Sequence, residues 1–189
     1  MSKKILIAYG SRFGSTEEIS THFKQTLEER GFNVELINLK TKHQKVPTIN
    51  NYSGVLIGSG IRIGRWTKEA KNFLKAHIPE INENRARTIV GIYLSSGEAS
   101  KPEERPGAVE KYLVKVFREL GLDLGGHILF DAFGGVFDLT ESSNLGRLNK
   151  RMLRMAAKED PNIDPDGRND WRDWEQINAF LENFITKIQ

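Results

Sequence analysis

Five short runs rich in Ile, Val and Leu alternate with amphipathic helical segments along this chain. A run that is apolar on both faces suits a strand inside a parallel sheet, and the helix between two such strands supplies the crossover that they need. The alternation therefore predicts an α/β fold in which helices cover both faces of a parallel sheet. The predicted strands cover residues 4–9, 33–39, 54–58, 88–94 and 127–132.

The length of the chain predicts its domain organisation. Its 189 residues suffice for one well-buried core and are too few for two ordinary domains, so we expect a single domain over 1–189. Residues 133–167 form a predicted insertion between the fifth strand and a last helix that begins near residue 170. Within the insertion, the apolar spacing predicts a helix over residues 143–158.

The composition limits the available chemistry. The sequence contains no cysteine, which excludes disulfides, thiolate metal sites, iron–sulfur clusters and thiol redox reactions. Any redox function must therefore come from a bound organic cofactor. No stretch approaches the roughly 20 apolar residues of a membrane span, and no signal peptide is recognisable, so we expect a cytoplasmic protein. The net charge of +3 suggests contact with an anionic partner.

Three loops at the carboxyl ends of predicted strands are the candidate binding segments, because ligands of doubly wound sheets sit at this edge. The first loop offers small residues for close backbone approach, hydroxyl donors and a helix N-terminus, which together suit a phosphate monoester. It lacks the lysine of a Walker A loop and the three glycines of the dinucleotide fingerprint. An ordinary capped turn is the alternative. The residues of this first loop are Ser11, Arg12, Phe13, Gly14, Ser15 and Thr16.

The second loop, residues 59–66, follows the third strand and is rich in glycine. Such a backbone can wrap the polar edge of a flat ring, and an aromatic side chain at its rim can stack on the ring. Alternatively, Trp66 packs in the core, and Arg62 and Arg65 are solvated surface charges. Arg62 lies inside the loop and is our candidate catalytic residue. The cofactor candidates here are Ser59, Gly60, Ile61, Arg62, Ile63, Gly64 and Trp66.

The third loop follows the fourth strand and contributes Ser95, Ser96 and Gly97, again at a position that suits the edge of a ring. A plain surface loop is the alternative here. The four histidines, His22, His43, His77 and His127, show neither metal-ligand nor triad spacing, so no metal site is predicted.

Three segments carry a resemblance to a known family. Residues 9–19 (YGSRFGSTEEI) resemble the FMN phosphate loop of flavodoxins, specifically the flavodoxin-domain family of menaquinone-dependent protoporphyrinogen oxidase. Residues 57–64 (IGSGIRIG) are similar to the second loop of that family, and residues 173–177 (DWEQI) to the opening of its last helix. Residues 133–158 match in position the insertion that precedes this helix.

The resemblance implies a flavodoxin-like sheet of order 2-1-3-4-5 and one FMN, with its phosphate on residues 11–16 and its ring between residues 59–66 and 95–97. It also implies oxidation of a porphyrinogen, with the electrons passed to a quinone. Two features depart from the family: Ile63 stands where an aromatic residue is frequent, and residues 133–137 lack its Arg- and Tyr-rich character.

Two other functions remain open on this fold. A flavodoxin-type electron carrier without a substrate of its own is one, although carriers that dock on basic partners are usually acidic and this chain is basic. A receiver-type signalling domain needs acidic residues after the first strand, where this chain has Tyr9, Gly10 and Ser11. We therefore expect an enzyme with a small-molecule substrate and a quinone or redox-protein partner, and no nucleic-acid partner.

The predicted helix over residues 143–158 has a basic face opposite an apolar one. Such a helix can lie on anionic lipid at the inner face of a membrane, where a quinone is accessible. A helix packed on the sheet, with its basic face in solvent, is the alternative. The apolar positions are Leu145, Leu148, Met152 and Ala156, and the basic ones are Arg147, Lys150, Arg151, Arg154 and Lys158.

Overall fold

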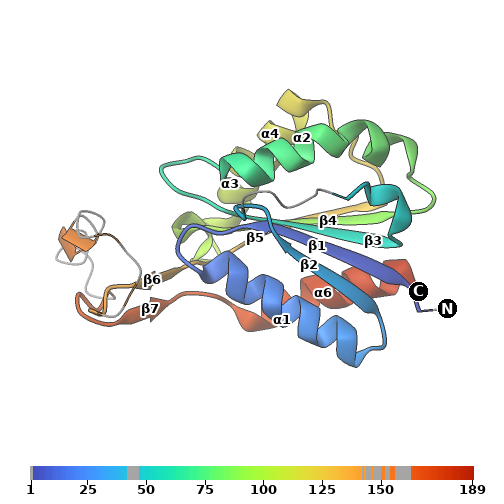
Figure 1. Cartoon of the computed structure of the whole chain (residues 1–189). Coiled ribbons are helices and arrows are strands. Elements are labelled where there is room, and N and C mark those ends of the chain that lie inside the picture. The colour runs from blue at the N-terminus through green and yellow to red at the C-terminus, as the bar shows by residue number, and fades with distance from the viewer. Residues whose placement is uncertain are drawn as a thin grey trace.

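A computed structural model describes residues 2–41, 47–141, 143, 146, 150–151, 154–155 and 163–189. Its main sheet has five parallel strands in the order β2-β1-β3-β4-β5, which confirms the predicted fold class (Figure 1). The strands are β1 (Lys4–Gly10), β2 (Asn33–Asn38), β3 (Gly54–Gly60), β4 (Ile89–Ser95) and β5 (Ile128–Phe133).

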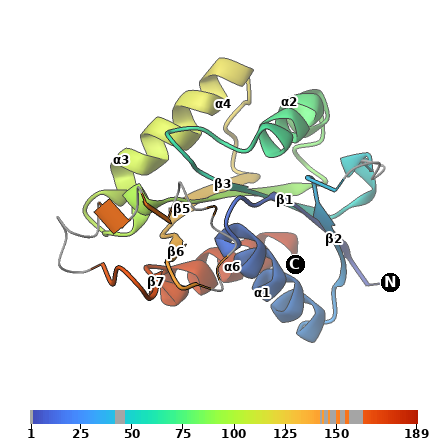
Figure 2. The ribbon, with the colours of Figure 1, turned by 60° about the vertical axis from the view of Figure 1, so that its left-hand side comes forward.

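Helices cover both faces of this sheet, as the strand–helix alternation predicts (Figure 2). One face carries α1 (Ser15–Glu29) and α6 (Trp174–Ile188), whose side chains form one apolar cluster with the sheet. The other face carries α2 (Lys68–Glu83) and a continuous helical segment, and these form the second cluster. That segment consists of α3 (Arg105–Val109), the π-helical turn η3 (Glu110–Val114) and α4 (Lys115–Leu120). The described part of the chain also contains the short 3-10 helices η1 (Ile49–Asn51) and η2 (Gly97–Ala99).

A glycine in β3 allows close packing between the sheet and α1. A β-carbon at Gly58 would lie only 2.5 Å from the ring of Tyr93 on β4, so only glycine leaves room for this tyrosine. The Tyr93 hydroxyl lies 2.7 Å from that of Ser20 on α1, and both groups are buried. This contact holds α1, and with it the first loop, against the centre of the sheet.

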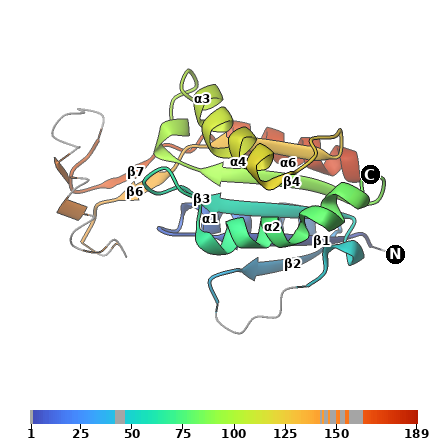
Figure 3. The ribbon, with the colours of Figure 1, turned by 90° about the horizontal axis from the view of Figure 1, so that it is seen from above.

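A two-stranded antiparallel sheet, which the sequence analysis did not predict, joins the insertion to the segment that follows it. Its strands are β6 (Val136–Asp138) and β7 (Arg168–Asp170), and they extend beyond the carboxyl ends of the main strands (Figures 1 and 3). Trp171 N–H donates to the carbonyl of Gly135 at 3.0 Å, which continues the pairing. The last helix begins at Trp174, four residues later than expected, because Asp173 caps it by accepting from the N–H of Gln176.

The predicted basic amphipathic helix over 143–158 falls mostly outside the described residues. Lys150 and Arg154, which are described, donate to the backbone carbonyls of Thr140 and Leu139 respectively. Among the helices that the structure describes, none is both long and apolar enough to cross a membrane. Membrane contact through this segment stays a prediction.

Candidate functional site

A cavity of about 390 Å³ opens at the carboxyl ends of β1, β3 and β4, where the strand order reverses. Its volume lies within the range of roughly 300–1,000 Å³ that is usual for small-molecule sites. All the site residues predicted from sequence line it except Ser11, Gly14, Ser59 and Trp66. The lining comprises Arg12, Phe13, Ser15, Thr16, Gly60, Ile61, Arg62, Ile63, Gly64, Ser95, Ser96, Gly97, Glu98, Tyr112, Gly135, Val136 and Phe137.

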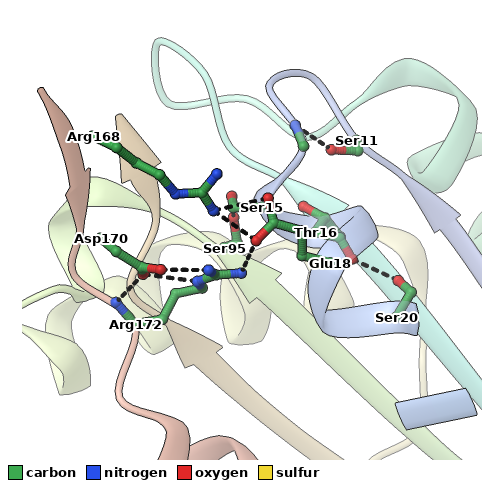
Figure 4. Close-up of polar contacts among 10 residues, drawn as sticks. Ser11, Ser15, Thr16, Glu18, Ser20, Ser95, Arg168, Asp170 and Arg172 are labelled. Carbon is green, nitrogen blue, oxygen red and sulfur yellow. Dashed lines mark hydrogen bonds and ion pairs between the residues drawn. The ribbon is translucent and has the colours of Figure 1, made fainter. Parts of the chain in front are cut away.

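The first loop brings a helix N-terminus and the side chains of Ser15 and Thr16 to the cavity lining. Figure 4 shows these two side chains at the start of α1. Gly14 has a φ of 99°, which a glycine adopts readily, and α1 begins at the next residue. Ser11 lies outside the lining and accepts from the N–H of Gly14 at 3.0 Å, so it shapes the turn. The hydroxyl of Ser15 lies 2.6 Å from that of Ser95, which joins the first loop to the third.

Thr16 has a buried hydroxyl without a hydrogen-bond partner among the described residues. It lies in the first turn of α1, where backbone N–H groups have no partners within the helix. An unsatisfied buried polar group costs roughly 1–3 kcal/mol, so its presence beside a cavity is informative. The hydroxyl and the helix N-terminus together form a site for an anion such as a phosphate.

The second loop reverses in a tight hairpin at the cavity rim. Arg62 and Arg65 exchange both backbone hydrogen bonds, at 3.0 and 3.1 Å, and the two residues between them have positive φ. Ile63 is one of these, with a φ of 49° and a side chain that is 80% exposed. A β-branched residue in this conformation is strained by about 1–3 kcal/mol. The guanidinium of Arg62 lies over the ring of Phe13, 5.6 Å from its centroid, so the first and second loops also meet.

The other predicted residues outside the lining support the second loop from behind. Ser59 is fully buried, and its hydroxyl accepts from the N–H of Thr67 at 3.0 Å. Trp66 is 6% exposed, and its indole N–H donates to the carbonyl of Tyr112 at 2.7 Å. The structure thus places Trp66 in the core, which is the alternative given for it above.

The sequence analysis missed the cavity residues Glu98, Tyr112, Gly135, Val136 and Phe137. The Tyr112 hydroxyl and the ammonium of Lys111 both donate to Glu98, and the Tyr112 hydrogen bond is the main cause that lowers the pKa of this carboxylate. Burial raises the pKa of Tyr112. Glu98 could have been predicted as a site residue, because it directly follows Ser96 and Gly97 in the sequence. Tyr112 and Phe137 carry no such signal, because each comes from an element distant in sequence.

A charged cluster ties the segment after the insertion to the first turn of α1 (Figure 4). Arg168 and Arg172 lie 2.7 and 2.8 Å from the carboxylate of Glu18, and Arg172 also pairs with Asp170. The side chain of Arg172 is only 3% exposed. These arginines offset the negative charge of Glu18, which would otherwise oppose an anion at the helix N-terminus.

The donor set suits a phosphorylated ring better than a metal. Among the described residues, no group of three or more His, Asp or Glu side chains is placed to hold a metal ion. The first loop supplies anion donors, whereas the second and third loops supply backbone amides, and Ile61 of the second loop and Phe137 of β6 supply apolar walls. This division fits a ligand with an anionic end and a flat body with polar edges.

Comparisons with known proteins agree with this fold. The family model for a flavodoxin domain matches residues 6–164. The protoporphyrinogen IX dehydrogenase (quinone) of Escherichia coli strain K12 is 30% identical over 112 residues, which cover 59% of each chain, so less than two thirds of that relative is matched. A flavodoxin of Streptococcus pneumoniae TIGR4 is 17% identical over 97% of this chain and 99% of its own, with a TM-score of 0.52. Rubredoxin oxygen:oxidoreductase of Desulfovibrio gigas is 16% identical over 98% of this chain and 36% of its own, with a TM-score of 0.53.

The two solved structures share the fold at low identity, whereas the family model covers most of the chain. The match begins within β1 and extends past β6, so it includes the loops that line the cavity. The chain therefore belongs to the flavodoxin-domain family, whose cofactor is FMN.

Proposed function

We propose that this protein holds one FMN non-covalently and uses it as an oxidoreductase, taking electrons from a reduced organic substrate and passing them to a quinone. The observation that carries the proposal is the unpartnered, buried hydroxyl of Thr16 at the N-terminus of α1, beside a cavity that all three loops line. A terminal phosphate supplies the acceptor that this hydroxyl lacks.

The residues of the first loop would hold the phosphate. Thr16 donates its hydroxyl, the first backbone N–H groups of α1 add donors, and Arg12 adds positive charge at the rim. The side chain of Arg12 donates to the carbonyl of Trp66 at 3.0 Å, which anchors the guanidinium beside the loop. Ser15 and Ser95 keep the first and third loops together around the cavity.

The residues of the second and third loops would hold the ring. Gly60 and Gly64 let the backbone approach closely, and Ser96 and Gly97 bound the opposite side. Phe137, brought in by the insertion, contributes an aromatic wall. When bound, FMN supplies two-electron redox chemistry. Arg62 would favour the negative charge that develops on the reduced ring, because its guanidinium lies at the rim of the same cavity.

The substrate side of the proposal draws on the curated relative. That Escherichia coli protein is named for protoporphyrinogen IX and a quinone, and we propose substrates of the same kinds for this chain. The net charge of +3 suits a carboxylate-bearing substrate. A flavodoxin-type electron carrier is the second candidate, since the family includes carriers and the fold is shared.

Anaerobic reduction of the purified protein separates the two functions. The flavin absorbance band is followed while protoporphyrinogen IX is added, and NADH and NADPH are added to separate samples. We expect rapid bleaching by the porphyrinogen and restoration of the band by a soluble menaquinone analogue. Bleaching only by an added reductase system would identify a carrier instead.

The cofactor itself is tested independently by heating. We expect the purified protein to be yellow and to release FMN, not FAD, because the first loop has room and donors for one phosphate and lacks the dinucleotide fingerprint. A colourless protein that takes up no added FMN would contradict the proposal at its first step.

A further inference from the structure

A second cavity, of about 440 Å³, lies between α2 and the η3–α4 segment, on one face of the sheet. It adjoins the first cavity, because Gly64 and Tyr112 line both. Figures 2 and 3 show α2 and α4 over the same face of the sheet. Its lining comprises Gly64, Arg65, Trp66, Lys68, Lys71, Asn72, Lys111, Tyr112, Lys115, Val116 and Glu119.

The lining of this second cavity is strongly basic. It holds five cationic side chains and a single carboxylate, that of Glu119. Lys71 lies 3.8 Å from Glu119, and Lys111 pairs with Glu98. Arg65, Lys68 and Lys115 have no ion pair within the described part of the chain. Cations gathered around one hollow repel one another, and an anion bound among them relieves that repulsion.

The floor of the second cavity is apolar and held in place. Trp66, Tyr112 and Val116 are all buried at about 9% exposure or less. Because the indole N–H of Trp66 already donates to the Tyr112 carbonyl, the floor offers ring surface rather than a free donor. A cavity with this floor and a cationic rim suits a ligand that combines an apolar body with an anionic end.

We propose that the second cavity binds a carboxylate arm of the molecule whose reacting part lies in the first cavity. The inference rests on the proposed oxidoreductase function and adds to it a recognition site made by Arg65, Lys68 and Lys115. Because Gly64 and Tyr112 line both cavities, an arm bound in the second cavity lies beside the flavin site. Selection for substrates with carboxylate arms follows from this arrangement.

An equilibrium titration tests this site without turnover. The probe is deuteroporphyrin IX, an unreactive porphyrin with two carboxylates, added to the oxidised, FMN-loaded protein and followed by porphyrin fluorescence. Its dimethyl ester serves as the uncharged comparison. The double variant Lys68→Gln/Lys115→Gln removes two cations of the rim. The matched control, Lys75→Gln/Arg118→Gln, removes two cations from the same two helices at positions that do not line the cavity.

We expect the rim variant to bind the dicarboxylate about tenfold more weakly than the parent, and the control variant to bind it within about twofold of the parent. The ester should bind all three proteins alike. Raising the salt concentration from about 20 to about 300 mM should weaken the binding of the dicarboxylate but not that of the ester. This loss of affinity should be smaller in the rim variant. FMN content, read from the flavin absorbance, should be equal in all three.

Equal affinity of the parent and the rim variant, an equal loss in the control variant, or no binding of the dicarboxylate at low salt would each overturn the inference. Failure of the proposed function has a different signature. In that case the porphyrin binds and the rim variant weakens it, but protoporphyrinogen IX does not bleach the flavin.

Discussion

The hydroxyl of Ser15, the first residue of α1, lies 2.6 Å from the hydroxyl of Ser95, the last residue of β4, and both side chains are buried. Replacing Ser95 with alanine leaves the Ser15 hydroxyl without this partner, so we expect Ser95→Ala to lower the free energy of unfolding by about 1 kcal/mol. Urea unfolding measures the change. Ser53→Ala, at the opposite end of the sheet, is the control and should change stability by less than about 0.5 kcal/mol. If Ser15→Ala and Ser95→Ala add without coupling in the double variant, the hydrogen bond contributes nothing.

Thr16 allows a test with opposite effects on the empty and the FMN-bound protein. Thr16→Val keeps the shape and removes the unpartnered hydroxyl, so the FMN-free protein should be at least as stable as the parent. The FMN affinity should fall by about 1–3 kcal/mol, because the phosphate loses a donor in a buried position. Flavin fluorescence titration and urea unfolding of the FMN-free protein provide the two measurements. Thr16→Ser should keep most of the affinity, and unchanged affinity in Thr16→Val would place the phosphate elsewhere.

Arg62 should tune the potential of the flavin. Its guanidinium lies at the rim of the first cavity over Phe13, where a cation favours the reduced, negatively charged ring. Arg62→Ala should therefore have a lower two-electron midpoint potential, measured by equilibration with a reference dye. The exposed Arg87, in the turn between α2 and β4, supplies the control Arg87→Ala. A midpoint potential equal to that of the parent would indicate that Arg62 is only a solvated surface charge.

His127 should make the protein less stable in acid. Burial lowers the pKa of this histidine, and its Nε2 has no hydrogen-bond partner among the described residues. The unfolded chain therefore binds a proton more readily than the folded one as the pH falls through about 6.5, so stability falls with the pH. The free energy of unfolding should drop between about pH 7.5 and about pH 5, and by less in His127→Gln. The half-buried His22, on α1, supplies the control His22→Gln, and an equal drop in all three proteins would contradict the prediction.

Much of the fold followed from local patterns. The five apolar runs, the helices between them and the three loops at the carboxyl ends are all visible because a buried parallel strand and an amphipathic helix each repeat over a few residues. The strand order came with the resemblance, and the structure confirms it. Most of the predicted site residues meet in one cavity for the same reason, since every parallel strand delivers its following loop to the same edge.

The sequence by itself thus determined the layers of this protein, the edge of the sheet where its site lies and the loop that suits a phosphate. Only the tertiary structure decided which distant residues complete that site. Phe137 reaches the cavity through the unpredicted β6–β7 pair, Tyr112 comes from a helix on one face of the sheet, and Arg172 meets Glu18 across 154 residues of sequence. Residues 65–72 and 111–119 likewise form one basic cavity only because two helices pack side by side. Such contacts depend on how the folded helices and strands pack against one another, so no short-range repeat in the sequence predicts them.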